Sequence, residues 1–300
     1  MVQTRNVAKR QKIDECTSCM ELVMFNSDSL FKIASYLPAD GLLNLALTCR
    51  RFGAAPLSDS DGDSSLSLVE ETARRLVHDI ATEEQRNALP GYDEYNWLFK
   101  YNYLQSLRKP LTFDQLVGQH IEYVEGNKSR VVTNNSASGW ATAFSNNIMM
   151  AGKHYASFEA SHGTDLLLGV IRPGEATQTA KYSPLSPSFY EHFTQRKGSV
   201  QYNNTVNCCM YIGFDGFCWS SDWESIDYEQ LRWDGMDRIY SPSTCKIGML
   251  LDLDEGTLSV YKNARKLGVM KRGLAGHYCW VVSLANETQV TIKRGTVPAS

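Results

Sequence analysis

The sequence predicts a multidomain α+β protein, in which a small N-terminal helical module precedes an antiparallel β-sandwich. Three observations support this prediction. Leucine-rich segments with helical spacing occupy the first third of the chain, and short alternating runs bounded by turn residues follow from residue 111 onward. Hydrophobic residues make up 43% of the 300 positions. That content is sufficient for a well-buried core.

Changes in composition divide the chain into five segments. We expect a disordered tail over residues 1–20, helices over 21–55, a flexible linker over 56–66, a helical bridge over 67–110 and the β-sandwich over 111–295. The tail is basic and almost without apolar residues, and the linker is rich in Ser, Asp and Gly. Only the second, fourth and fifth segments therefore carry enough apolar residues to fold.

The segment 21–55 reads as two short helices. Leu30, Ile33 and Leu37 fall at helical spacing, and Pro38 ends this first helix because proline lacks the N–H of a helix interior. The second helix has an apolar stripe, formed by Leu42, Leu43, Ala46, Leu47 and Cys49. Two such helices cannot bury their apolar faces on each other alone. Either the rest of this chain or another protein must cover them.

The segment 67–110 contains two further helices. Ser67 and Glu70 have the spacing of a capping box at the start of the first, which either completes the helical module or connects it to the sandwich. The second is rich in aromatic residues, includes Trp97 and ends before Pro110. Apolar residues recur at helical spacing in both, so each packs on a neighbour.

Residues 246–263 have the pattern of a β-hairpin. Every second position from Ile247 to Leu253 is apolar, and the alternation resumes after Gly256, which can adopt the positive φ of a short turn. Bulky residues on the opposite face, such as Tyr261, indicate an inner position in a sandwich. The acidic residues before Gly256 lack the spacing of a calcium loop, so we interpret them as turn residues.

The hairpin and the residues after it resemble the C-terminal half of a SPRY domain over 246–294. The shared features are the IG-x-x-L-D strand, the GTLS-x-Y-x-N strand, LGV and the final Y-x-x-VS run, whereas Ala264 stands where the family has glycine. The resemblance implies a rigid sandwich whose loops bind a target protein or a short peptide. It places the partner contacts at Trp140, Tyr211, Ala285 and Asn286. Trp219 and Trp280 are expected in the core.

The segment 21–55 resembles an F-box. The matching residues are Tyr36-Leu37-Pro38, Asp40, Leu42-Leu43 and Thr48-Cys49-Arg50-Arg51-Phe52. The resemblance implies docking on the Skp-type adaptor of a cullin-RING ubiquitin ligase, with a cullin as the scaffold. The adaptor contacts that it implies are Leu30, Ile33, Leu37, Pro38, Leu42, Leu43 and Leu45.

Composition and motifs exclude several other classes of protein. A formal net charge of −3 disfavours a nucleic-acid partner, and no apolar run could span a membrane. We expect an intracellular protein of the cytoplasm or nucleus. The chain has no phosphate-binding loop, nucleophile elbow or zinc-protease helix, and Cys16 and Cys19 lack a second ligand pair. The sequence thus predicts no enzyme activity, no cofactor and no metal.

Three functions remain open. The first is substrate recognition in a ubiquitin ligase, in which an adaptor holds the helices and the sandwich holds the protein to be modified. The second is an interaction scaffold without a link to ubiquitin, whose helices pack only on their own chain. The third is a carbohydrate-binding sandwich.

Overall fold

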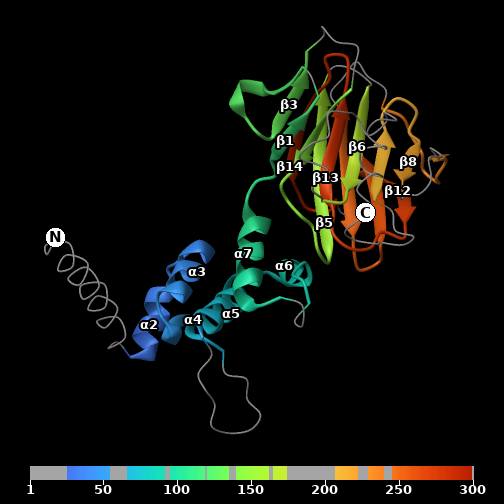
Figure 1. The fold of residues 1–300 in the computed structure, drawn as a ribbon. Coiled ribbons are helices and arrows are strands. Elements are labelled where there is room, and N and C mark those ends of the chain that lie inside the picture. Colours follow the sequence, from blue (N-terminus) through green and yellow to red (C-terminus); the bar gives the residue numbers. More distant parts are fainter. Residues whose placement is uncertain are drawn as a thin grey trace, which may run out of the picture. The chain divides into compact units, whose positions relative to one another are not determined.

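The computed structural model describes residues 26–54, 66–91, 95–118, 120–134, 140–161, 165–173, 207–221, 229–239 and 245–298. The chain divides into two compact units, Met1–Arg108 and Lys109–Ser300 (Figure 1). The first is helical and the second is built of strands, as the sequence predicts. The expected tail, all but the last residue of the expected linker, and Cys16 and Cys19 lie outside the described residues.

The helical unit is built around one apolar cluster. Its helices are α2 (Ser27–Ala34), α3 (Ala39–Thr48), α4 (Arg50–Gly53), α5 (Leu68–Ile80), α6 (Glu83–Asn87) and α7 (Trp97–Arg108). The buried side chains come from α2, α3, α4, α5 and α7, and include Leu30, Leu42, Phe52, Ala73 and Leu104. Of the two roles left open for the helical segment 67–110, the packing of α5 and α7 favours completion of the helical module, because both contribute to the core of the first two helices.

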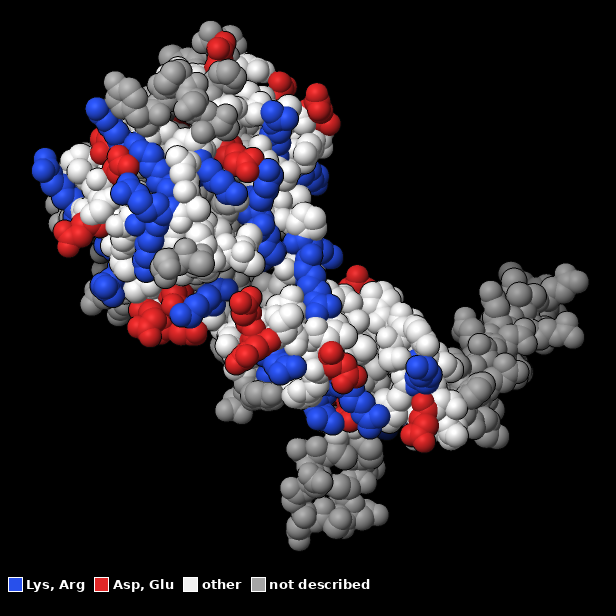
Figure 2. All heavy atoms as spheres, turned by 180° about the vertical axis from the view of Figure 1, so that it is seen from behind, with Lys and Arg blue, Asp and Glu red and all other residues white. Residues whose placement is uncertain are grey.

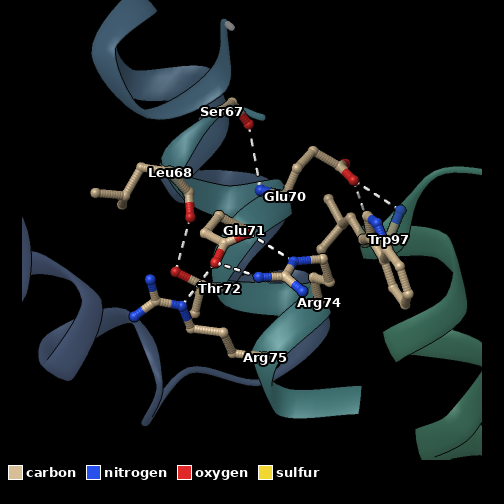
Figure 3. A network of polar contacts seen from close by, with 9 residues as sticks. Ser67, Leu68, Glu70, Glu71, Thr72, Arg74, Arg75 and Trp97 are labelled. Atoms are coloured by element: carbon tan, nitrogen blue, oxygen red, sulfur yellow. Dashed lines mark hydrogen bonds and ion pairs between the residues drawn. The ribbon is translucent and has the colours of Figure 1, made fainter. Parts of the chain in front are cut away.

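The N-termini of α2 and α5 are capped by side chains, which satisfy backbone N–H groups that have no partner within the helix. Asn26 accepts a hydrogen bond from the Ser29 N–H at 2.8 Å, and Ser67 accepts one from the Glu70 N–H at 3.2 Å. The capping box predicted at Ser67 and Glu70 is only half formed. The Glu70 carboxylate instead accepts a hydrogen bond from the backbone N–H of Trp97 at 2.7 Å (Figure 3).

The second unit is a sandwich of two antiparallel seven-stranded sheets. In order across the first sheet, the strands are β1 (Phe113–Val117), β4 (Ala141–Ser145), β13 (Cys279–Leu284), β6 (Leu166–Ile171), β7 (Cys208–Ile212), β8 (Cys218–Ser221) and β9 (Glu229–Leu231). Those of the second sheet are β12 (Arg265–Arg272), β11 (Thr257–Lys262), β10 (Cys245–Asp252), β5 (Lys153–Ser161), β14 (Gln289–Arg294), β3 (Arg130–Thr133) and β2 (Ile121–Tyr123).

The hairpin identified in the sequence lies inside the second sheet. Strand β10 pairs with β11 on one side and with β5 on the other, and the side chains of Ile247, Met249 and Leu251 enter the core between the sheets. Gly256 has φ +62° at the turn. The inner position predicted for this hairpin is confirmed.

The first sheet is apolar on both of its faces. Leu166, Leu168 and Val170 of β6 enter the core between the sheets, whereas Leu167 and Ile171 belong to a second buried cluster on the opposite face. Strand alternation requires this division, because neighbouring side chains point to opposite faces. Trp280 packs in the first cluster and Trp219 in the second, and both are 1% exposed. The prediction that these two tryptophans are core residues is confirmed.

Candidate protein-interaction surfaces

The seven apolar residues predicted to contact an adaptor differ in their exposure to solvent. Leu30 and Leu42 are 4% and 0% exposed in the core of the helical unit. The prediction that a partner contacts these two side chains is therefore wrong for this structure. Leu37 and Leu45 are half-buried against the same core. Ile33, Pro38 and Leu43 are exposed. Leu30 and Leu42 are buried because one face of α2 packs on α5 and one face of α3 packs on α5 and α7, and these two leucines lie on those faces.

Four large apolar side chains on α2, α3 and the turn between them remain in contact with solvent. Ile33 is 45% exposed, Tyr36 75%, Leu43 47% and Leu47 77%. We call these four residues the exposed apolar set. They are four of the seven large apolar side chains that the described residues leave exposed, and they lie within 15 positions of one another. Such concentration on a small unit is typical of an interaction surface.

Tyr36 and Leu47 are absent from the residues that the sequence singled out as adaptor contacts. A signal for Leu47 was present, because it follows Leu43 by four positions and residues with that spacing share a helix face. Tyr36 lies after the end of α2, where its ring has the Lys32 ammonium 5.4 Å from its centroid. Its exposure depends on the geometry of the turn, which helical spacing cannot predict.

A cavity of about 300 Å³ opens between α2 and α5, next to this region of the helical unit. Phe31 and Arg75 line it, and the guanidinium carbon of Arg75 lies 4.3 Å from the centre of the Phe31 ring. Arg75 is held by Glu71, whose carboxylate also binds Arg74, each at 2.7 Å (Figure 3). Hydrogen bonds from Arg74 and Arg75 lower the pKa of Glu71 to about 2. Arg75, one of the residues that line the cavity, thus belongs to a charge network with Glu71 and Arg74.

Two of the partner-binding residues predicted in the sandwich are core residues instead. Tyr211 is 0% exposed, its hydroxyl donates to the carbonyl oxygen of Asp237, and burial raises its pKa. Ala285 is 5% exposed, and its N–H donates to the carbonyl oxygen of Asp165 at 3.0 Å. Neither side chain can contact a partner in this structure, which corrects both predictions.

The other two predicted positions are accessible to different degrees. Asn286 is exposed in the turn between β13 and β14, has φ +51°, and donates from its amide to a carboxylate oxygen of Asp165 at 2.6 Å. Trp140 is half-buried and packs on the second cluster of the first sheet. Residues 135–139 before it lie outside the described residues. A role for Asn286 and Trp140 in partner binding stays a prediction.

The acidic hairpin turn has a structural role. One carboxylate oxygen of Asp252 accepts hydrogen bonds from the N–H groups of Asp254 and Glu255 at 3.2 and 3.1 Å, and the other pairs with Lys153 at 2.9 Å. A carboxylate engaged in this way organises the turn, as we interpreted from the sequence. In the parts of the chain that the structure describes, no group of three or more His, Cys, Asp or Glu residues could hold a metal ion.

The buried cysteines of the sandwich are reduced thiols. Cys208, Cys209 and Cys218 are 0% exposed, and the sulfur atoms of Cys209 and Cys218 are 3.6 Å apart. Burial raises the pKa of Cys279 to about 12, so this thiol does not ionise near neutral pH. The expected role of Cys208, Cys209, Cys218 and Cys279 as small buried side chains agrees with this burial.

Comparisons with known proteins give matches only at the level of structure. No family model matches the sequence, and no curated protein matches it. The SPRY domain of human HERC1 is 12% identical, with a TM-score of 0.40 over 61% of this chain and 97% of that chain. The TRIM65 PSpry domain is 17% identical, with a TM-score of 0.42 over 62% of this chain and 90% of that chain. None of the described helices is long and apolar enough to cross a membrane.

Proposed function

We propose that this chain is the substrate-recognition subunit of a cullin-RING ubiquitin ligase that acts in the cytoplasm or nucleus. In this proposal the helical unit binds a Skp-type adaptor, and the β-sandwich binds a target protein or a short peptide of it. The chain itself has no catalytic role, because tethering alone raises the concentration of target lysines near the ligase.

The observation that carries the proposal is the exposed apolar set. Ile33, Tyr36, Leu43 and Leu47 stay exposed although the same two helices bury Leu30 and Leu42 in an intact core. The core of the helical unit is therefore complete without them, and the concentration of four exposed large apolar side chains on two consecutive helices favours an interaction surface. The resemblance of residues 21–55 to an F-box suggests the Skp-type adaptor as that partner.

The test is a pull-down of the purified full chain with a Skp-type adaptor. We expect the double substitution Leu43→Asp and Leu47→Asp to abolish binding, because it places two charges in the proposed interface while leaving the buried leucines unchanged. The matched control is Phe214→Asp in the sandwich, which also replaces an exposed apolar side chain, 45% exposed, by a charge. Adaptor binding that is absent in the folded wild type, or unchanged in the double variant, would contradict the proposal.

A second candidate is a protein-binding scaffold without a link to ubiquitin. It is favoured by the burial of Leu30 and Leu42 on α5 and α7, which shows that the first helices have a partner surface within their own unit. The pull-down discriminates the two candidates. If the folded chain does not bind the adaptor but still binds peptides through the sandwich, the scaffold function is correct.

A further inference from the structure

The outward face of the second sheet combines an aromatic centre with basic side chains. Residues at alternate positions of β10, β5, β14, β11 and β12 point away from the core, because their neighbours Ile247, Phe158, Ile292 and Val260 fill it. The outward residues include the acids Glu159 and Asp252, and we call six of the others the basic sheet face: Lys246, Leu250, Tyr155, Tyr261, Lys266 and Lys293. Figure 2 shows Lys and Arg side chains gathered over the sandwich.

Tyr155 lies flat across the neighbouring strand at the centre of this face. A Cβ atom added to Gly248 of β10 would lie only 1.9 Å from the Tyr155 hydroxyl oxygen, so only glycine leaves room for the ring. Gly295 lies under the other side of the ring, where a Cβ would be 3.3 Å from two of its carbons. The ring of Tyr261 meets Tyr155 edge-on, with centroids 5.6 Å apart and an interplanar angle of 85°. Two glycines therefore make space for a rigid aromatic platform.

The aromatic platform is accessible although much of its surroundings is buried. Tyr155 and Leu250 are half-buried, whereas Tyr261 and Ser157 are each 4% exposed. Burial raises the pKa of both Tyr155 and Tyr261, so both hydroxyls remain neutral at physiological pH. The centre of the face thus offers apolar and aromatic area without a charge of its own.

The lysines around the platform differ in their pairing. Lys293 binds Glu159 at 2.7 Å, and Lys153 at the end of β5 binds Asp252 at 2.9 Å. Lys246 and Lys266 are exposed, and no carboxylate of the described residues lies within 4.0 Å of either ammonium group. Glu159 is the cross-strand neighbour of Lys246, but its carboxylate is paired with Lys293. Two positive charges beside the platform are consequently available to an external carboxylate.

Protection of a sheet edge explains only part of this arrangement. Lysines on an edge strand prevent pairing with other chains, and Lys266 lies on the edge strand β12. Lys246 and Tyr155 lie on β10 and β5, which are paired on both sides, so no edge needs protection there. A nucleic acid is disfavoured as a ligand of this face, because binding to its phosphates requires more basic residues than the two unpaired lysines. The net charge of −3 of the whole chain also disfavours it.

We propose that the basic sheet face binds an acidic segment of the target protein. Carboxylates of that segment would pair with Lys246 and Lys266, and one apolar side chain would pack on Tyr155 and Leu250. Charge complementarity at the rim with aromatic area at the centre is the usual anatomy of a peptide-binding surface. The inference rests on target binding by the sandwich but is independent of adaptor docking by the helices.

The test is a selection of random twelve-residue peptides displayed on phage against the immobilised full chain. We expect the selected peptides to be enriched in Asp and Glu, and to bind the double variant Lys246→Glu and Lys266→Glu at least tenfold more weakly. The variant Lys246→Arg with Lys266→Arg keeps the charges and should keep the affinity. Selected peptides without acidic enrichment, or with equal affinity for the Glu variant, would overturn the inference.

Further variants test the platform and the nature of the ligand. Tyr155→Ala should weaken peptide binding, and Gly248→Ala should do so too, because the added methyl displaces the Tyr155 ring. Circular dichroism and thermal unfolding identify variants that fail to fold. Vesicles containing phosphatidylserine and a single-stranded oligonucleotide serve as competing probes, and lysine-dependent binding to these in place of acidic peptides would refute the inference. Because Lys246 and Lys266 are outside the helical unit, adaptor binding reports separately on the proposed function.

Discussion

One carboxylate oxygen of Glu70 lies 2.7 Å from the backbone nitrogen of Trp97 and 3.3 Å from that of Leu98, so a side chain of α5 caps the N-terminus of α7 (Figure 3). A carboxylate at this end of a helix satisfies N–H groups without an intrahelical partner and interacts favourably with the helix dipole. These hydrogen bonds couple two helices through residues that are 27 positions apart in the sequence.

We predict that Glu70→Ala destabilises the helical unit by about 1 kcal/mol, the typical value of a lost N-terminal cap. Hydrogen exchange of the α7 amides, measured by mass spectrometry, checks the prediction because it reports on this unit separately from the sandwich. Glu83→Ala, at the start of α6 where it is exposed, is the control and should change exchange in α7 little. Equal protection of α7 in the wild type and the Glu70 variant would show that the cap is dispensable.

Leu42 and Leu47 should respond very differently to truncation, although both lie on α3. Leu42 is 0% exposed and Leu47 is 77% exposed. We expect Leu42→Ala to cost about 2–5 kcal/mol through the cavity that it leaves, and Leu47→Ala to change stability by about 0.5 kcal/mol or less. Hydrogen exchange of α3, α5 and α7 in both variants measures the difference. Similar losses in the two variants would mean that Leu47 is buried in solution.

Ala264 should be replaceable by glycine with a gain in stability. Asn263 and Ala264 form the two-residue turn between β11 and β12 with φ +49° and +68°, a conformation that costs residues with a Cβ atom about 1 kcal/mol. We expect Ala264→Gly to raise the stability of the sandwich by about 0.5–1 kcal/mol. Urea unfolding followed by tryptophan fluorescence measures the shift. The control Ala275→Gly changes an exposed alanine outside the positive-φ residues and should bring no gain.

Because His154 is buried, we predict that the sandwich loses stability on mild acidification. The side chain is 4% exposed, its Nε2 donates to the carbonyl oxygen of Ala151 at 2.8 Å, and burial lowers its pKa from 6.5 to about 4. The unfolded chain therefore takes up this proton first. The contribution is fully present above pH 6.5 and is lost as the pH falls from 6.5 to about 4, with a size of about 3 kcal/mol.

The measurement for His154 is urea unfolding at pH 7 and pH 4.5 for the wild type and His154→Gln. Carboxylates titrate over the same interval in both proteins, so the difference between them isolates the histidine. We expect the wild type to lose more stability than the variant. Equal losses would show that His154 does not titrate differently in the folded and unfolded states.

Several features of this fold follow from local sequence because they depend on the period of the apolar residues. Alternation from Ile247 to Leu253 predicted the strand β10 and the face that it buries, and helical spacing predicted α2, α3 and α5. Gly256 predicted the turn, because few other residues adopt its positive φ. Each of these depends on residues within one or two turns or strands of the chain.

The candidate surfaces depended on contacts that local patterns do not contain. Leu42 and Leu43 are adjacent and chemically identical, yet α5 and α7 bury only Leu42. Which of the two leucines is buried is evident only once the helices are packed together. Tyr211 was expected to contact a partner, but the pairing of β7 with β6 and β8 places it inside the sandwich. Local patterns in the sequence therefore predict the main helices and strands and their apolar faces. Which apolar residues are buried follows from the packed fold, because burial is set by neighbours distant in the sequence.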